Sequence, residues 1–190
     1  MRTSTTRSNL LRILFSLLPL LSAGVAIADG RQLPETVLRV DLDRYAGTWY
    51  EIARLPNGFQ DQCAGNVTAD YRRLDDGNIE VVNRCVDKKG MLDVAHGVAR
   101  VVDRATNAKL EVSFVSLFGW RLFWGDYWIL YLDDDYTHVV VGTPNRKYAW
   151  ILARTTTLPT QAWERSLQVL LRAGYDPQKL VKTEQPEPAS

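Results

Sequence analysis

The side chains that could perform chemistry are few, and they are scattered along the chain. The sequence contains two cysteines, Cys63 and Cys85, and two histidines, His96 and His138. The motifs typical of serine hydrolases, zinc proteases, dithiol oxidoreductases and phosphate-binding loops do not occur. Cys63 could act as a nucleophile, but only as a free thiol that faces a binding pocket. We therefore predict no catalytic residues, and a thiol enzyme remains an alternative.

The charged side chains suggest binding more than reaction. The acidic run Asp133–Asp135 lacks the ligand spacing of a calcium loop, so we expect a solvated turn there, no metal and no cofactor. Glu51 lies in a predicted strand, where its carboxylate could anchor a polar group of a ligand or pair with a nearby arginine. Arg54 and Arg121 could each bind a carboxylate or phosphate headgroup, or remain solvated surface charges.

The composition is that of one globular domain. The chain has 190 residues, of which 46% are hydrophobic and 24% are charged. These fractions exclude disorder, a coiled coil or collagen as a description of the whole chain. The formal net charge of +1 offers no basic face, so we do not expect nucleic acid as a partner.

Residues 1–28 have the pattern of a secretory signal peptide. Three arginines accompany the start of a short apolar stretch, and Ala26-Ile27-Ala28 matches the small-x-small pattern of a cleavage site. The apolar stretch is shorter than the roughly 20 residues that a membrane span needs. No cysteine precedes Cys63, so the sequence offers no acceptor for an N-terminal lipid. The sequence predicts a protein that is secreted across the inner membrane, periplasmic or associated with the outer membrane, and not lipidated.

The remaining sequence alternates between short strands and turns and then changes to a helical period. The pattern predicts strands at 49–54, 67–74, 79–85, 92–103, 110–115, 127–132, 137–142 and 148–154. From Pro159 to Ala173 the apolar residues Trp163, Leu167, Leu170 and Leu171 form one face of a helix. We predict an all-β fold, an eight-stranded antiparallel up-and-down barrel with the helix packed on its outer wall. Residues 184–190 contain two prolines and are predicted to be a flexible tail.

Three short motifs occur in order along these predicted strands. They are Gly47-x-Trp49 in the first strand, Asp135-Tyr136 between the sixth and seventh, and Arg154 at the end of the last. The motifs resemble the signatures of the lipocalin family, in particular bacterial lipocalins and apolipoprotein D, although the second is degenerate. The resemblance runs from about Val40 to Lys182 and implies a calyx, so we assign residues 29–183 to one lipocalin domain. We expect a structural role for the motif residues, with Trp49 closing the narrow end and Arg154 lying over its indole.

Strand alternation, with Trp49 and Arg154 taken as inward, predicts which side chains line the barrel. Trp128 is also the position at which the resemblance implies a pocket-lining aromatic. An eight-stranded barrel has room for one small ligand, and apolar walls favour a fatty acid, a lysophospholipid or a similar amphiphile. The predicted ligand-binding residues are Glu51, Ala53, Leu110, Val112, Phe114, Trp128, Leu130, Val139, Val141, Tyr148 and Trp150.

Two further features belong to the open end of the predicted barrel. Cys63 follows the first strand and Cys85 ends the third, so both lie at this end on neighbouring strands. In an oxidising compartment we predict that they form a disulfide, with two buried free thiols as the alternative. The segment Leu117–Trp124 is rich in Leu, Phe and Trp, and soluble proteins rarely expose such a patch without a use. It could be a gate or a tip that touches membranes transiently, a dimer contact, or a loop folded into the mouth.

These observations predict an extracytoplasmic lipid-binding or carrier protein. It would hold a fatty acid, a lysophospholipid or a similar hydrophobic ligand in its barrel without changing it chemically, in envelope lipid storage or transport. The alternative is an isomerase or hydrolase of the same fold that acts on a lipid, and a third hypothesis is a structural envelope protein with an empty pocket.

Overall fold

The computed structural model describes residues 32–118 and 120–186. The predicted signal peptide lies outside the described residues. No helix in the described part of the chain is both long and apolar enough to cross a membrane.

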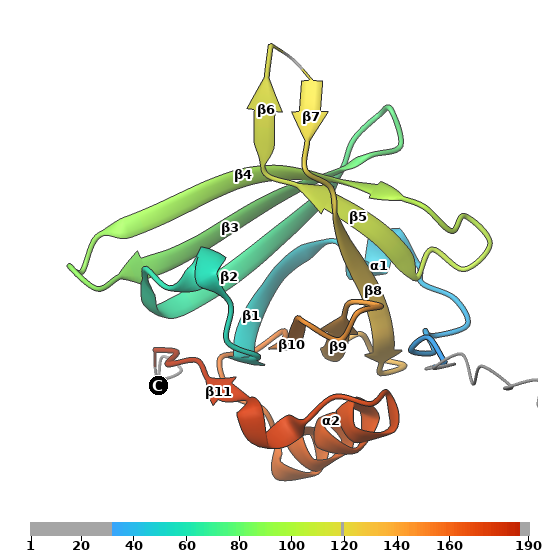
Figure 1. The fold of residues 1–190 in the computed structure, drawn as a ribbon, viewed down its shortest axis with the longest axis vertical. Coiled ribbons are helices and arrows are strands. Elements are labelled where there is room, and N and C mark those ends of the chain that lie inside the picture. Colours follow the sequence, from blue (N-terminus) through green and yellow to red (C-terminus); the bar gives the residue numbers. More distant parts are fainter. Residues whose placement is uncertain (1–31, 119, 187–190) are drawn as a thin grey trace, which may run out of the picture. The chain divides into compact units, whose positions relative to one another are not determined.

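Eight antiparallel strands form a closed barrel (Figure 1). They are β1 (Gly47–Arg54), β2 (Cys63–Arg73), β3 (Ile79–Asp87), β4 (Leu92–Val101), β5 (Lys109–Ser113), β8 (Gly125–Leu132), β9 (His138–Gly142) and β10 (Ala149–Ala153). Each strand pairs with the one before it in this order, and β10 pairs with β1 to close the wall. The predicted barrel is therefore confirmed, with strand boundaries that differ from the expected ones by a few residues.

Shorter elements surround this barrel. A one-turn helix, α1 (Leu42–Tyr45), precedes β1, and the 3-10 helix η1 (Gly58–Gln60) follows it. After β10 come the helix α2 (Thr160–Arg172), the 3-10 helix η2 (Pro177–Lys179) and the two-residue strand β11 (Val181–Lys182). We call the end of the barrel that contains α1 the base, and the opposite end the mouth.

The base is closed by stacked aromatic side chains. Tyr45 of α1 lies against Trp49, with ring centroids 5.0 Å apart, and the Trp49 Nε1 donates a hydrogen bond to the Tyr45 carbonyl. Arg154 covers the indole of Trp49, and its Nε donates to the carbonyl of Tyr136. All three motifs thus meet at the base, as their order in the sequence predicts. Asp135 lies in the exposed turn beside Tyr136.

Gly47 allows β1 to begin directly beneath Arg154. Its φ of +95° lies in the region that side chains disfavour, and a Cβ at this position would be 3.4 Å from the Arg154 Nη1. The first residue of the first motif is therefore explained by backbone geometry.

Two bulges change which side chains face the axis of the barrel. In β1, Glu51 pairs with Leu152 but Ala53 pairs with Ile151, so Ile52 is an extra residue. In β8, Ile129 pairs with Val141 but Tyr131 pairs with Val140, so Leu130 is extra. Because side chains alternate along a strand, one extra residue moves every later side chain to the opposite face.

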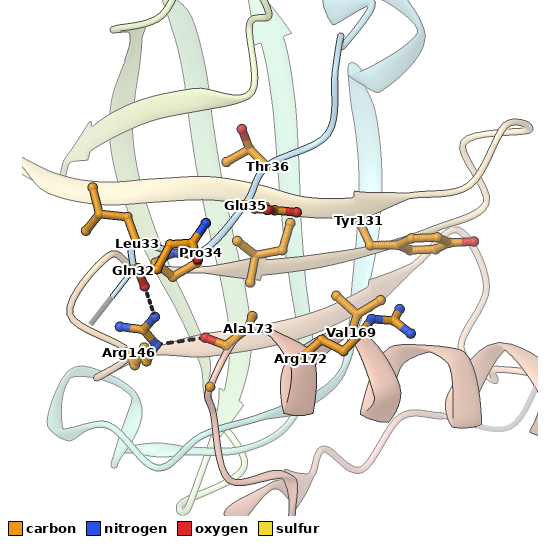
Figure 2. A pocket seen from close by; sticks show the side chains of 12 residues that line it. Gln32, Leu33, Pro34, Glu35, Thr36, Tyr131, Arg146, Val169, Arg172 and Ala173 are labelled. Carbon is orange, nitrogen blue, oxygen red and sulfur yellow. Dashed lines mark hydrogen bonds between the residues drawn. The ribbon is translucent and has the colours of Figure 1, made fainter. Parts of the chain in front are cut away.

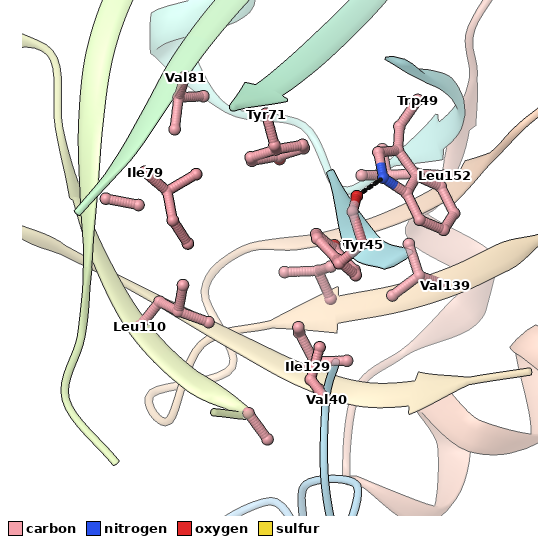
Figure 3. Packing of buried hydrophobic residues seen from close by; sticks show 13 residues of the cluster. Val40, Tyr45, Trp49, Tyr71, Ile79, Val81, Leu110, Ile129, Val139 and Leu152 are labelled. Atoms are coloured by element: carbon pink, nitrogen blue, oxygen red, sulfur yellow. Dashed lines mark hydrogen bonds between the residues drawn. The ribbon is translucent and has the colours of Figure 1, made fainter. Parts of the chain in front are cut away.

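The buried hydrophobic residues form two clusters, one on each face of the barrel wall. The inner cluster fills the base (Figure 3) and contains Val40, Tyr45, Trp49, Tyr71, Ile79, Val81, Ala99, Ala108, Leu110, Ile129, Val139, Val141 and Leu152. The outer cluster lies between the wall and α2 and contains Ala53, Leu55, Leu130, Val140, Ala149, Ile151, Val169, Leu170 and Tyr175.

Helix α2 packs on the outside of the barrel, as predicted, but with a rotated face. Its buried residues are Ser166, Val169 and Leu170, whereas Leu171, which the pattern predicts on the packed face, is 58% exposed. The predicted stripe is wrong at that position, because the buried face of the helix runs through Ser166, Val169 and Leu170.

The end of the described chain fills a gap between β1 and β2 in the wall. β1 pairs with β2 only from Gly47 to Tyr50, and beyond this point the two strands separate. Residues 181–185, which we call the C-terminal strap, lie in the gap. β11 pairs with Ala53 and Arg54 of β1, and the backbone of Glu184 accepts a hydrogen bond from Asn66 N in β2.

The strap corrects part of the predicted flexible tail. The amide of Gln185 donates to the carbonyls of Glu51 and Val67, one in each of the separated strands. Glu184 and Gln185 are therefore held in the wall, because they supply hydrogen-bond partners that the two strands do not give each other.

The segment between β5 and β8 forms a hairpin that projects from the barrel (Figure 1). Its strands are β6 (Val115–Leu117) and β7 (Trp120–Leu122), and they pair only with each other. Phe118 is 92% exposed and Trp120 is 76% exposed. The hypothesis of a loop folded into the mouth is therefore wrong, and we call residues 115–122 the projecting hairpin.

Candidate ligand-binding site

The inner wall carries a continuous set of apolar side chains from base to mouth. Leu110, Val139 and Val141 belong to the inner cluster, and Val112 and Trp150 pack against it. The structure therefore places these predicted residues on the inner wall. Their contact with a ligand stays a prediction.

Three aromatic rings lie together on the mouth side of this wall. Tyr148, directly before β10, and Trp150 of β10 lie together, with ring centroids 6.1 Å apart. Phe59 of η1 lies against both, at 5.2 Å from Tyr148 and 6.2 Å from Trp150. The helix η1 therefore covers part of the inner wall from the mouth.

Phe114 lies beside Gly97 of the neighbouring strand β4. A Cβ built on Gly97 would be 2.7 Å from the Phe114 ring, so the missing side chain of Gly97 makes room for the phenyl group. Phe114 directly follows β5 and continues the alternation of Leu110 and Val112, and it is 41% exposed just before the projecting hairpin begins.

Three predicted wall residues are on the outer face instead. Ala53 and Leu130 belong to the outer cluster, and Trp128 packs against that cluster with the Lys109 Nζ 4.5 Å from its ring centroid. Ala53 is displaced by the bulge at Ile52. In β8 the inward residues are Tyr127 and Ile129, and the bulge then brings Leu132 inward as well.

The bulge in β1 also brings a charged residue to the inner wall. Arg54 is paired in register with Trp150, and Glu51 with Leu152, so Arg54 and Glu51 share the inner face. The Arg54 Nη1 donates to the Glu51 Oε1 at 2.8 Å. Glu51 is only 3% exposed, and its pairing with a nearby arginine was one of the two roles expected for it.

Three further groups complete this buried polar cluster. The Gln60 amide donates to the Glu51 Oε2 at 2.8 Å, and the Thr183 hydroxyl of the strap donates to the Glu51 Oε1 at 2.5 Å. The Trp150 Nε1 donates to the Gln60 Oε1 at 3.0 Å. The Glu51 carboxylate is therefore held by β1, η1 and the C-terminal strap together.

A second polar cluster lies at the base, where no sequence pattern predicts it. The hydroxyl oxygens of Tyr45 and Tyr127 are 2.7 Å apart, and the Tyr71 hydroxyl donates to that of Tyr127 at 2.9 Å. Burial raises the pKa of Tyr71 to about 12 and the pKa values of Tyr45 and Tyr127 well above the ordinary value. All three tyrosines therefore stay protonated and can bond to one another.

One hydroxyl proton of this tyrosine cluster is not used in a hydrogen bond between the tyrosines. Three hydroxyl groups supply three protons, and the two hydrogen bonds among them use two. Within the cluster, one donor can therefore point to another acceptor, such as the oxygen of a ligand or a water molecule.

Several inward side chains are not fully covered by their neighbours. Ala69, Val112, Tyr127 and Trp150 face the axis and are only half-buried. In a closed wall, the surface that such side chains retain faces the interior. Side-chain packing fills the base and leaves accessible apolar surface above it.

Cys63 and Cys85 form a disulfide between the start of β2 and the end of β3, as predicted. The bond joins two neighbouring strands at the mouth. It also removes the free thiol that the enzyme hypothesis requires of Cys63.

A separate hollow of about 520 Å³ lies outside the barrel, between residues 32–36, β8 and α2 (Figure 2). Leu130 and Val169 line it, which agrees with the outward position of Leu130. The Arg146 Nε donates to the Ala173 carbonyl at 2.7 Å, and its Nη2 donates to the Gln32 carbonyl. Arg146 thus ties the first described residues to the end of α2.

Arg121, the other arginine considered for a headgroup, lies in β7 opposite Ser116 and belongs to the projecting hairpin. Within residues 32–118 and 120–186, no three His, Cys, Asp or Glu side chains gather closely enough to hold a metal ion.

Comparisons with known proteins agree with this architecture. A family model described as a lipocalin-like domain matches residues 40–185. The outer membrane lipoprotein Blc of Escherichia coli (strain K12) is 37% identical over 179 residues, which cover 90% of this chain and 98% of Blc. Temperature-induced lipocalin-1 of Arabidopsis thaliana is 36% identical over 156 residues, which cover 80% of this chain and 82% of that protein. Mouse apolipoprotein D is 32% identical over 152 residues, covering 76% and 77%.

Solved structures show the same fold. Insecticyanin of the tobacco hornworm, Manduca sexta, matches with a TM-score of 0.64 and 26% identity, over 82% of this chain and 87% of its own. Apocrustacyanin C2 matches with a TM-score of 0.63 and 19% identity, over 77% of this chain and 81% of its own.

Proposed function

Because the chain belongs to the lipocalin family, whose members bind small hydrophobic ligands, we propose that it carries one fatty acid, lysophospholipid or similar amphiphile in its barrel. The observation that carries this proposal is the set of half-buried apolar side chains on the inner wall, Val112 and Trp150 among them. Such accessible apolar surface gains free energy when a ligand removes it from water. No bond in the ligand needs to change.

The chain would work outside the cytoplasm. The signal-like residues 1–28, the disulfide and the similarity to an outer membrane lipoprotein support a place in the cell envelope.

The projecting hairpin would bring the carrier to a membrane. Its apolar side chains stand away from the barrel, and Phe118 at the turn is the most exposed of them. An apolar tip of this kind gains free energy by entering the interface of a bilayer. Replacing Phe118 and Trp120 with Ser should slow transfer of ligand between vesicles and leave affinity in solution unchanged. Unchanged transfer would contradict this role.

The carrier proposal is tested by filling the barrel. Val112 points to the axis, and its neighbour Glu111 points outward to Arg100. We expect delipidated protein to bind oleate and a lysophospholipid saturably, at one ligand per barrel, as followed by tryptophan fluorescence. Val112→Trp should weaken binding at least roughly tenfold because the indole occupies the interior, whereas Glu111→Trp should bind normally. Equal affinities for both variants, or no binding by the unaltered protein, would contradict the proposal.

A further inference from the structure

Arg54 is a charged side chain of the inner wall whose hydrogen bonds are incomplete among the described residues. Its Nη1 donates to the Glu51 Oε1 at 2.8 Å and to the Thr183 Oγ1 at 3.3 Å. Its Nε is buried and has no hydrogen-bond partner. The Nη2 donates to no described residue, and it is not among the fully buried unpartnered atoms.

The unpartnered atoms lie on one edge of the guanidinium. The Nε–H and one Nη2–H are parallel and form the fork that binds two oxygens of a carboxylate or phosphate. Glu51 is bound through Nη1, on a different edge, so the ion pair leaves this fork unused. A buried N–H without an acceptor is unfavourable, and a ligand oxygen would relieve that cost.

The position of Arg54 in the barrel fits the polar end of an amphiphile. Arg54 is opposite Trp150 in the wall, on the mouth side of the apolar inner cluster. Its side chain is 14% exposed, so part of it can be reached. A ligand whose headgroup binds here could extend its chain along the half-buried Val112 and Tyr127 toward the base.

We propose that the Nε–Nη2 edge of Arg54 binds the acidic headgroup of the ligand, a carboxylate or a phosphate, inside the mouth of the barrel. This inference rests on the proposed carrier function and narrows the ligand to acidic single-chain lipids. Glu51 holds the guanidinium in place, and Gln60 and Thr183 hold Glu51. The headgroup reaches the buried Nε when η1, which bonds to this cluster through Gln60, shifts toward the mouth.

The test compares ligands that share one chain but differ in headgroup. Oleate and oleoyl lysophosphatidate carry the acidic groups, and oleyl alcohol is the neutral probe. We expect the unaltered protein to prefer both acids over the alcohol by roughly tenfold or more. In Arg54→Gln this preference should disappear, with affinity for oleyl alcohol within about twofold of normal. Comparing oleate with lysophosphatidate then shows which acidic group the site prefers.

Two further variants make the result decisive. Arg54→Lys keeps the charge but cannot hold Glu51 and also present a fork, so it should recover only part of the preference. The double variant Glu51→Gln/Arg54→Gln removes both charges, which avoids an unpaired buried carboxylate if Arg54→Gln folds poorly. Arg72→Gln, at the exposed surface of β2, is the matched control and should behave normally.

The outcomes separate this inference from the proposal on which it rests. If Arg54→Gln, or the double variant in its place, keeps the preference for acids, the headgroup site is refuted and the carrier function stands. If the unaltered protein binds the alcohol as tightly as the acids, the headgroup site is likewise refuted. If it binds none of the three probes, the carrier function itself fails.

Discussion

The guanidinium of Arg154 lies over the indole of Trp49, 3.9 Å from the ring centroid. It also donates hydrogen bonds to the backbone carbonyls of Arg44, Tyr45, Ala46, Thr48 and Tyr136. One side chain thus joins α1, the strand β1 and the turn before β9 at the base.

Replacing this side chain should destabilise the whole barrel. Arg154→Met should lower the free energy of unfolding by about 2–4 kcal/mol, because several backbone carbonyls lose their donor at once. Urea denaturation measures the change. Arg72→Met is the control, since Arg72 is 67% exposed and pairs only with Glu80 at the surface. It should cost less than about 1 kcal/mol, and equal losses would contradict the role given to Arg154.

The tyrosine cluster should be visible in an alkaline titration. The folded pKa of Tyr71 is about 12, and those of Tyr45 and Tyr127 are raised well above the ordinary value by burial. Their contribution to stability is complete below the ordinary value of 10.0 and is lost as the pH rises through the folded pKa values. Tyrosinate absorbance should therefore stay incomplete until the protein unfolds.

A single substitution tests the hydrogen bonds of that cluster. Tyr127→Phe should remove about 1–3 kcal/mol of stability, because Tyr45 and Tyr71 both lose their partner. Tyr50→Phe, on the outer face of β1, is the control and should change stability by less than about 0.5 kcal/mol. If the two variants are equally stable, the hydroxyl contacts contribute nothing.

His138 should make the protein less stable in weak acid. Its ring is buried beside Asp133, with the Nδ1 3.4 Å from the Asp133 Oδ1. Burial lowers the pKa of His138 from 6.5, Asp133 partly offsets this, and Arg165 lowers it further. The unfolded chain then binds more protons than the folded one below about pH 6.5, so stability falls as the pH drops toward the folded pKa.

The same effect can be assigned to one of the two histidines. His138→Gln should remove this slope, which cannot exceed about 1.4 kcal/mol per pH unit for one proton. His96→Gln, at an exposed position of β4, should keep it. Denaturation midpoints at several pH values between neutral and weakly acidic measure the slope. A slope that survives in His138→Gln would place its origin elsewhere.

Two tryptophans distinguish the inner wall from the outer one. Trp150→Ala should weaken lipid binding roughly tenfold, because the indole faces the interior. Trp128→Ala should cost about 2–4 kcal/mol of stability, because the indole packs in the outer cluster. Its lipid affinity should stay within about twofold of normal, measured with a fluorescent fatty acid. The reverse result would mean that β8 is one residue out of register.

The disulfide should stabilise the mouth by restricting the unfolded chain. The two cysteines are 22 residues apart. In the chain-entropy model, a loop of this length contributes about 3 kcal/mol. The double variant Cys63→Ala/Cys85→Ala should lose about this amount, and a reducing agent should lower the stability of the unaltered protein equally. A reductant effect in the double variant would show a different cause.

Strand order, helix position and the closed base could be predicted from the sequence because each depends on a long pattern. The three motifs at Trp49, Tyr136 and Arg154 mark one end of the barrel, and the eight alternating segments determine the wall. The identity of the inward residues depends on single positions. One extra residue at Ile52 or Leu130 reverses the alternation, and neither position carries a glycine or proline that would indicate a bulge.

The error in β8 has a further cause. Its residues Tyr127 to Leu132 are apolar or aromatic on both faces, because α2 and the outer cluster cover the outside of this strand. Where both faces are buried, hydrophobic periodicity does not distinguish inside from outside. The tyrosine cluster is hidden for the same reason, since alternation with Trp128 taken as inward places Tyr127 on the outer face.

Because the C-terminal strap fills a gap in the wall, closure of the barrel depends on the order in which the chain is synthesised. The mouth half of β1 emerges early from the ribosome, yet Gln185, which bonds to Glu51 in the gap with β2, follows 134 residues later. Until Gln185 has emerged, this stretch of β1 presents an open strand edge, which invites pairing with other chains. The wall of the barrel is therefore complete only after the C-terminal strap has been synthesised.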